Sequence, residues 1–299
     1  MPISHLLLAL SVVFIWGTNF PIIRIGLADF PPFLFSALRF LLSAVPWIFL
    51  FPRPKAPWQL LAGVGLLLGC GQFGLLYWAL QHDITPGLAS LVIQSQVFFT
   101  IIMAMILARE RLTPLQIVAL LLAVGGYAVV AGHIETGPGA AVTVAGLLLV
   151  LAAALSWACA NMLVRRAGRV DAAGFMAWSS LYASLPLGVL CLVMYGPGAI
   201  AGAIAHAGWP AWGSLFWQAL GNTVYGFGVW NWLLARHPAA IVTPTALLVP
   251  VFGMLSSALI LAEPLAAWKL WAAALVLSGL ALNMHAGRAA ARAMRRARS

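Results

Sequence analysis

The sequence predicts an all-α membrane protein in which ten transmembrane helices form two inverted five-helix repeats around a central cavity. Three observations carry this prediction: the composition, ten long apolar runs and an internal duplication. Of the 299 residues, 63% are hydrophobic and only 7% are charged, whereas a soluble domain carries about 25% charged residues. So little charge cannot cover a water-exposed surface, and lipid is therefore the expected solvent.

The apolar runs are long enough to cross a bilayer, which takes about 20 residues per helix. Backbone polar groups have no water to bind in lipid, so each run is expected to be a helix. Breaks of Pro, Gly or charged residues separate the runs, which are 4–26, 32–51, 58–80, 86–107, 113–132, 142–165, 172–195, 210–235, 240–262 and 265–286.

The duplication begins in the first run. Trp lies eight residues before Arg both in Trp16–Arg24 and in Trp157–Arg165, and a Glu with a Leu two residues after it recurs at Glu110 and Glu263. The chain therefore divides into repeat 1 (1–140), repeat 2 (141–286) and a basic tail (287–299). Five spans per repeat is an odd number, so the two repeats are expected to be inverted, as in many transporters, with the substrate site between them.

Basic residues set the expected orientation. With a cytoplasmic N-terminus, all of the 16 Lys and Arg residues except Arg24, Arg39 and Lys269 fall on the cytoplasmic side, as the positive-inside rule requires. Both termini are then cytoplasmic. The net charge of +10 comes from residues that flank apolar runs, so it indicates membrane topology and not nucleic-acid binding.

Polar and aromatic side chains inside the runs are the candidate substrate site. A polar group in mid-membrane costs free energy unless it faces protein or water, and single ones often only bond to another helix. Together with aromatic walls they favour a cavity for an amphipathic solute. The candidates are Trp16, Asn19, Arg39, Gln72, Tyr77, Trp78, Gln94, Trp157, Asn161, Trp178, Tyr182, Tyr225 and Asn231.

Arg39 is the one deeply placed charge. It could hold a carboxylate-bearing substrate, or it could snorkel or pair with Asp29. None of the acidic residues falls at a midplane, where proton-driven exchangers usually place one. Facilitated diffusion or exchange is therefore expected, or else a driving ion that neutral groups bind. Glu110 and Glu263 are expected to cap the start of the next helix.

Glycines and prolines mark two further features. Gly65, Gly69, Gly221 and Gly226 give the third and eighth runs a face of small residues, suited to close helix contact or to flexing. Pro244 in the ninth run removes a backbone hydrogen bond and is expected to disturb that helix.

Enzyme chemistry is not expected. Cys70, Cys159 and Cys191 have no CxxC spacing, and no HExxH motif or mid-span carboxylate pair is present. We therefore expect no catalytic residue, no cofactor and no metal. The expected partners are a small-molecule substrate and membrane lipid, and the chain is expected to be monomeric.

The chain resembles the EamA family of the drug/metabolite transporter superfamily. The matching motifs are Trp16-Gly17-Thr18-Asn19-Phe20, Leu38-Arg39-Phe40, Ala108-Arg109-Glu110-Arg111-Leu112-Thr113, Gly125-Gly126 and Glu263-Pro264-Leu265. Within the family it is most similar to the YddG-type exporters of neutral and aromatic amino acids. The second half departs from the pattern at Ala158 and Pro264.

The resemblance implies ten helices, a basket-shaped cavity, alternating access and export of small metabolites across a bacterial inner membrane. Two other functions in the same superfamily remain open. Multidrug efflux would call for a Glu in the first helix, and nucleotide-sugar or sugar-phosphate antiport would call for several buried cations. An intramembrane enzyme is the remaining alternative.

Overall fold

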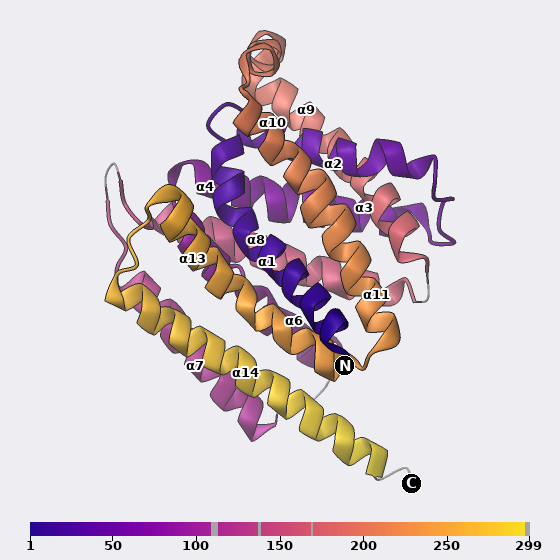
Figure 1. Cartoon of the computed structure of the whole chain (residues 1–299), viewed down its shortest axis with the longest axis vertical. Coiled ribbons are helices and arrows are strands. Elements are labelled where there is room, and N and C mark those ends of the chain that lie inside the picture. The colour runs from indigo at the N-terminus through magenta and orange to yellow at the C-terminus, as the bar shows by residue number, and fades with distance from the viewer. Residues whose placement is uncertain (109–112, 137–138, 169, 297–299) are drawn as a thin grey trace.

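A computed structural model describes residues 1–108, 113–136, 139–168 and 170–296. Helices dominate this part of the chain (Figure 1), and one isolated antiparallel bridge joins Ile84 to Val142. The N- and C-termini both lie toward the lower end of the view in Figure 1.

The first half begins with two α-helices, continues through an interrupted helix and a broken helix, and ends on a regular one. Its elements are α1 (Ile3–Gly26), α2 (Pro32–Ile48), α3 (Trp58–Leu66), η1 (Leu67–Gly74), α4 (Leu75–His82), α5 (Pro86–Val92), α6 (Ser95–Ala108) and α7 (Pro114–Ala131).

The second half follows the same order of helix types. Its elements are α8 (Val144–Arg166), α9 (Ala172–His206), α10 (Trp209–Phe216), η2 (Trp217–Phe227), α11 (Gly228–Arg236), α12 (Ala239–Val242), η3 (Thr243–Leu248), α13 (Val249–Leu261) and α14 (Ala267–Arg296).

Eight helical stretches in the described residues are long and apolar enough to cross a membrane. They fall in eight of the ten expected runs. The run at 32–51 forms the 17-residue helix α2, which ends ahead of the Pro52–Pro54 segment, where prolines cannot continue it. The run at 210–235 is helical from Trp209 to Arg236, but Gln218 and Asn222 give it a more polar character.

Two corresponding helices contain π-helical segments. η1 lies between α3 and α4, and η2 lies between α10 and α11. Gly69 lies in η1, and Gly221 and Gly226 lie in η2, whereas Gly65 lies just before η1 in α3. Each π turn takes in an extra residue. Such segments are uncommon and occur often at functional sites. The glycine-rich faces therefore coincide with a change of helix type, which the sequence alone did not predict.

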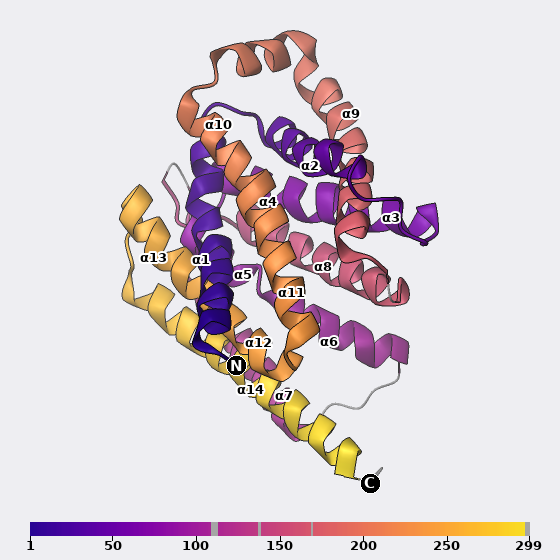
Figure 2. The ribbon, with the colours of Figure 1, turned by 45° about the vertical axis from the view of Figure 1, so that its right-hand side comes forward.

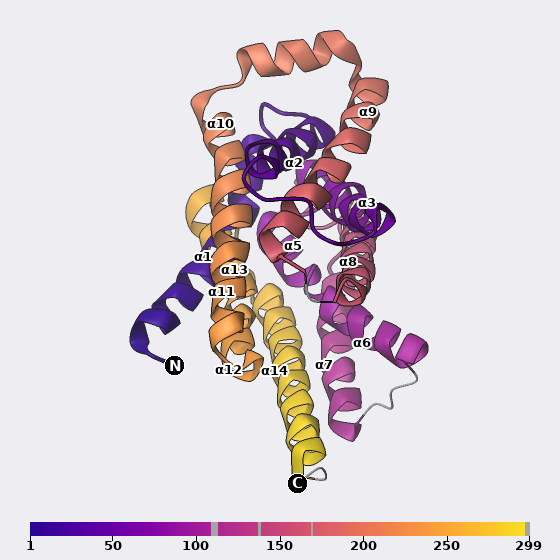
Figure 3. The ribbon, with the colours of Figure 1, turned by 90° about the vertical axis from the view of Figure 1, so that its right-hand side faces the viewer.

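The fourth and ninth runs are broken helices. α5 ends at Val92 and α6 starts at Ser95, while the prolyl bond at Pro244 falls in the 3₁₀ segment η3. α9 also differs from the expected run at 172–195, because Gly196 adopts φ 74° and a second helical segment follows it to His206. Figure 3 shows this segment bending across to α10. α14 continues to Arg296, beyond the expected end at 286.

Helices pack mainly on helices of the other half. α7 lies along α14 in Figures 1 and 2, and α2 packs on α9. α1 contacts α13 and η2, while α8 contacts α6 and η1. The two halves therefore interlock instead of forming separate domains.

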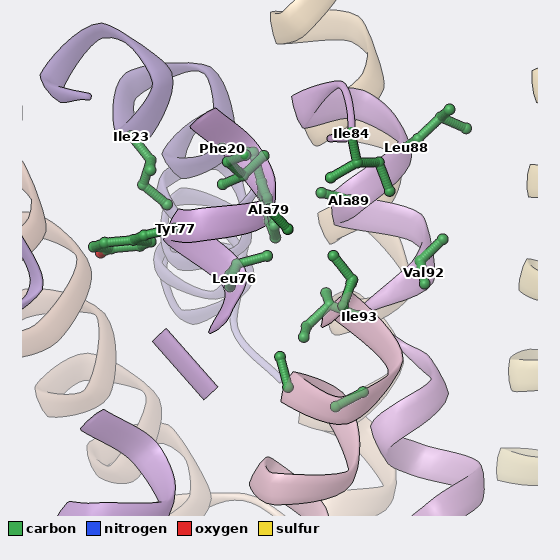
Figure 4. Packing of buried hydrophobic residues seen from close by; sticks show 14 of the residues in the cluster. Phe20, Ile23, Leu76, Tyr77, Ala79, Ile84, Leu88, Ala89, Val92 and Ile93 are labelled. Carbon is green, nitrogen blue, oxygen red and sulfur yellow. The ribbon is translucent and has the colours of Figure 1, made fainter. Parts of the chain in front are cut away.

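The core joins α1, α4 and α5, as the close view in Figure 4 shows. Phe20 and Ile23 of α1 lie beside Leu76 and Ala79 of α4, and Leu88 of α5 extends the same cluster. Because lipid is as apolar as these side chains, close van der Waals packing holds them together.

A buried ion pair of the second half also binds the first half. Lys269 Nζ lies 2.9 Å from Glu263 Oε1, and the two side chains are 2% and 5% exposed. The other Glu263 oxygen, Oε2, accepts a hydrogen bond from the Gly87 N–H at the start of α5. The expectation that Glu263 caps the next helix was therefore wrong: it caps α5, in the other half. Glu110 lies outside the described residues.

Gly17 provides a test of this packing. A Cβ at Gly17 would meet Phe252 Cβ and lie 2.8 Å from the Val249 carbonyl oxygen, whereas nothing lies within 4 Å of one at Gly125. Overpacking costs about 1–3 kcal/mol. We therefore expect Gly17→Ala to lower the thermal unfolding midpoint in detergent. Gly125→Ala is the control and should leave the midpoint unchanged or raise it.

Candidate functional site

Arg39 of α2 lies at the centre of the buried polar contacts. Its side chain is 1% exposed. Nη1 donates a hydrogen bond to Tyr77 Oη at 3.0 Å, and Nη2 donates one to Thr223 Oγ1 at 3.3 Å. Nε has no hydrogen-bond partner among the described residues. Nε is therefore a guanidinium nitrogen that is free to donate to a ligand.

Two aromatic rings cover the guanidinium. Its Cζ lies 3.7 Å from the ring centroid of Phe73 and 5.0 Å from that of Phe40. A ring face attracts a cation, and the attraction grows when both partners are out of water. The rings stabilise the charge without neutralising it.

The contacts of Arg39 extend to four helical elements. Tyr77 Oη donates to Gln218 Oε1 at 3.1 Å, and Gln218 Nε2 donates in turn to Asn19 Oδ1. Thr223 Oγ1 donates to the Gln218 carbonyl oxygen at 3.0 Å. We call these five residues the Arg39 network. It joins α1, α2 and α4 of the first half to η2 of the second half.

No carboxylate in the described residues pairs with Arg39. The expected alternative of pairing with Asp29 was wrong, because Asp29 accepts a hydrogen bond from the Gly208 N–H at 2.8 Å. The other described acids also bind elsewhere. Their partners are the Thr143 hydroxyl for Asp83, the Ala141 N–H for Glu135, the Gly174 N–H for Asp171, and Lys269 with the Gly87 N–H for Glu263.

A second group of candidates lies where α1 meets η2 and α11. Trp16 Nε1 donates to the Asn222 carbonyl oxygen at 3.3 Å, and its ring lies 5.1 Å from that of Trp230. Tyr225 Oη lies 2.7 Å from Ser11 Oγ. These contacts hold α1 against the second half along its length.

Asn161 and Trp157 lie on α8. Asn161 Nδ2 donates to Gln96 Oε1 of α6 at 3.1 Å, and half-buried Trp157 packs on the main core. Gln72 is buried in η1, next to Phe73. Gln94 is buried at the break between α5 and α6.

The remaining candidates do not converge on the Arg39 network. Trp178 and Tyr182 pack in a separate cluster with Leu61 and Val64, and Trp178 Nε1 donates to the Phe51 carbonyl oxygen at 3.5 Å. Asn231 is exposed. Trp78 follows Tyr77 but stacks on Phe33, with ring centroids 5.6 Å apart.

Two members of the Arg39 network were not among the candidates. Gln218 is fully buried and Thr223 nearly so. Gln218 could have been selected from the sequence, because it is an amide inside an apolar run, which is the feature that selected Gln72. No group of His, Cys, Asp and Glu in the described residues is arranged to hold a metal ion.

The fold and the network define a class: a helical membrane protein with a polar centre between two interlocked halves. The chain belongs to the EamA-like transporter family, whose sequence pattern matches residues 3–132 and 144–284. This family membership indicates a transporter and not an enzyme, in a membrane environment and with a small-molecule substrate.

Two curated relatives match almost the whole chain. A protein of Salmonella typhimurium named "Probable amino-acid metabolite efflux pump" is 39% identical over 282 residues, which cover 93% of each chain. The Escherichia coli protein of the same name is 37% identical over 281 residues, again 93% of each. A solved crystal structure with 22% identity covers 96% of this chain and 99% of its own, with a TM-score of 0.61, and supports the fold.

Tyr77→Phe tests the connection through the network. The change leaves Gln218 Oε1 and Arg39 Nη1 without their partner, and a buried unsatisfied group costs about 1–3 kcal/mol. We expect a lower thermal unfolding midpoint in detergent. Tyr127→Phe is the matched control, because the buried Tyr127 hydroxyl has no hydrogen-bond partner among the described residues. Equal midpoints for the two variants would contradict the importance of the network.

Proposed function

We propose that this protein exports amino acids, neutral and aromatic ones in particular, by alternating access. In this proposal the chain acts as a monomer with ten spans and both termini in the cytoplasm of a bacterial cell. The two inverted repeats enclose the substrate between them. The carboxylate of the substrate binds at Arg39, and the neighbouring rings and amides contact the rest of it.

The observation that carries the proposal is the uncompensated charge of Arg39. A buried charge is stable in protein when it is paired, and no carboxylate of the described residues pairs with this one. A substrate carboxylate could accept from the guanidinium in bidentate geometry. A change of rotamer at Thr223 would move its hydroxyl away from Arg39 without breaking backbone structure, which would free Nη2 for the substrate.

The inverted repeats are supported by the helix contacts. If each helix is exchanged for its counterpart in the other half, the contact of α1 with α13 becomes that of α8 with α6. The contact of α1 with η2 becomes that of α8 with η1, and the pairs α7–α14 and α2–α9 map onto themselves. A pseudo-two-fold axis gives this pattern, and five spans per half would then turn one half upside down.

The names of the two relatives favour amino acids over other substrates. The two alternatives fit the site less well. A cationic drug would be repelled by Arg39, and a phosphate would call for further cations. Lys269, the other buried cation described, is already paired with Glu263.

Arg39→Gln tests the substrate carboxylate. Removing one partner of a buried charged pair costs about 2–5 kcal/mol, which is about 30-fold or more in affinity. We expect phenylalanine counterflow in proteoliposomes to require a much higher concentration for half-saturation. We also expect the variant to lose the preference of the wild type for phenylalanine over phenylalaninamide, which has no carboxylate.

Arg24→Gln is the control for this experiment. Arg24 is an exposed guanidinium whose donors bind the Leu80 and Gln81 carbonyl oxygens at the end of α4. Its removal should leave the preference for phenylalanine intact. If Arg39→Gln folds, as judged by size-exclusion chromatography, and keeps the wild-type preference, the carboxylate assignment is wrong.

Energy coupling is tested in the same liposomes. No acid lies in the Arg39 network, so we expect phenylalanine to move down its own gradient at equal pH on both sides. Uptake that needs an imposed pH gradient, and that a protonophore abolishes, would contradict facilitated diffusion or exchange.

A further inference from the structure

A cavity of about 310 Å³ lies outside the Arg39 network, where α1 meets α2 at the end of α1 opposite to the N-terminus. Three aromatic residues and three polar ones supply its chemistry: Phe30, Trp78 and Tyr195, with Asp29, Gln81 and His82. Its volume is that of a small-metabolite site. We call it the Asp29 cavity.

The aromatic wall is fixed in place. Trp78 stacks on Phe33, and Phe33 also contacts Tyr195, with ring centroids 6.3 Å apart. Phe30 is held between Phe35 and Trp212. Rigid aromatic surfaces bind apolar side chains, and their faces attract cations.

The polar wall contains a carboxylate that can accept further hydrogen bonds. Asp29 Oδ2 accepts the Gly208 N–H, while Oδ1 has no hydrogen bond to the described residues and Asp29 has no ion pair there. The nearby cation Arg24 already binds the carbonyl oxygens that end α4. A carboxylate can accept several hydrogen bonds, so Oδ1 can receive an N–H from a ligand.

The bend in α9 lies beside the cavity, which is open to the outside of the protein. Tyr195 lines the cavity immediately before Gly196, whose φ of 74° turns the chain. The following segment crosses over the top in Figure 3 and returns at Gly208, which donates to Asp29. Both ends of this crossing segment therefore meet the same cavity.

The cavity lies next to the Arg39 network along α4 and α2. Tyr77 and Trp78 are consecutive, and one contacts Arg39 while the other lines the cavity. Pro32 of the cavity and Arg39 are seven residues apart on α2, about 10 Å of helix. A cationic site and an anionic site thus follow each other through the protein.

We propose that the Asp29 cavity is a second binding site, for the primary ammonium group of a ligand with an apolar or aromatic body. Asp29 accepts the ammonium N–H, and Trp78 and Tyr195 cover the apolar part. The cavity would also bind the exported amino acid after its carboxylate leaves Arg39, and this role rests on the proposed function. Binding of the amine itself does not.

The test is isothermal titration calorimetry on the purified full chain in detergent. The probes are phenethylamine, which has the ammonium group without a carboxylate, and 3-phenylpropionate, which has the reverse. We expect wild type to bind phenethylamine, whereas 3-phenylpropionate is a ligand for Arg39 and its affinity should not fall when Asp29 is changed. Asp29→Asn should weaken phenethylamine binding about fivefold, which is the scale of a partly exposed ion pair. The loop should keep its structure, because the amide oxygen of Asn can still accept the hydrogen bond from the Gly208 N–H.

Glu135→Gln is the matched control. Glu135 is an exposed acid on a loop outside the cavity, and its neutralisation should leave phenethylamine affinity unchanged. Absence of phenethylamine binding, equal phenethylamine affinity in Asp29→Asn and wild type, or an equal loss of 3-phenylpropionate affinity in Asp29→Asn would overturn the proposal. If phenethylamine binds as expected but phenylalanine is not transported, this site stands and the proposed function falls.

Discussion

A guanidinium without a counter-charge is the constraint on which the rest of the structure depends. Arg39 is buried among helices of both halves, and its partners there are hydroxyl groups and aromatic rings. Desolvating a charge is costly, so the surrounding side chains are arranged to stabilise it. Tyr77, Gln218, Asn19 and Thr223 form one connected set for this reason, and that set crosses the boundary between the two halves.

Two segments with altered backbone geometry meet at the guanidinium. η1 holds Phe73 against the guanidinium, and η2 supplies Gln218 and Thr223. In a π-helical turn the carbonyl and amide groups are spaced differently, so side chains leave the helix in directions that a regular helix would not give. The same device occurs at corresponding places in both halves, which ties the centre of the molecule to the duplication.

The sequence predicted the helical membrane class and the family because both depend on composition and on short motifs along one chain. The apolar runs, the repeated Trp–Arg spacing and Trp16-Gly17-Thr18-Asn19-Phe20 are all local signals. Gln218 was missed although it is an amide inside an apolar run, and Trp178 was placed in the central site because the sequence does not show which face of a helix points inward. Likewise, the cap made by Glu263 crosses between halves, which spacing along the chain cannot indicate.

The link from Lys269 through Glu263 to Gly87 has a mechanical consequence. Removing one partner of a buried ion pair costs about 3–5 kcal/mol, so helices joined by this pair are expected to travel as one unit. α5, α13 and α14 are then expected to form one rigid group of helices, drawn from both halves. Bending is left to the interruption after Val92 and to the 3₁₀ segment that contains Pro244, where the proline has no N–H to donate.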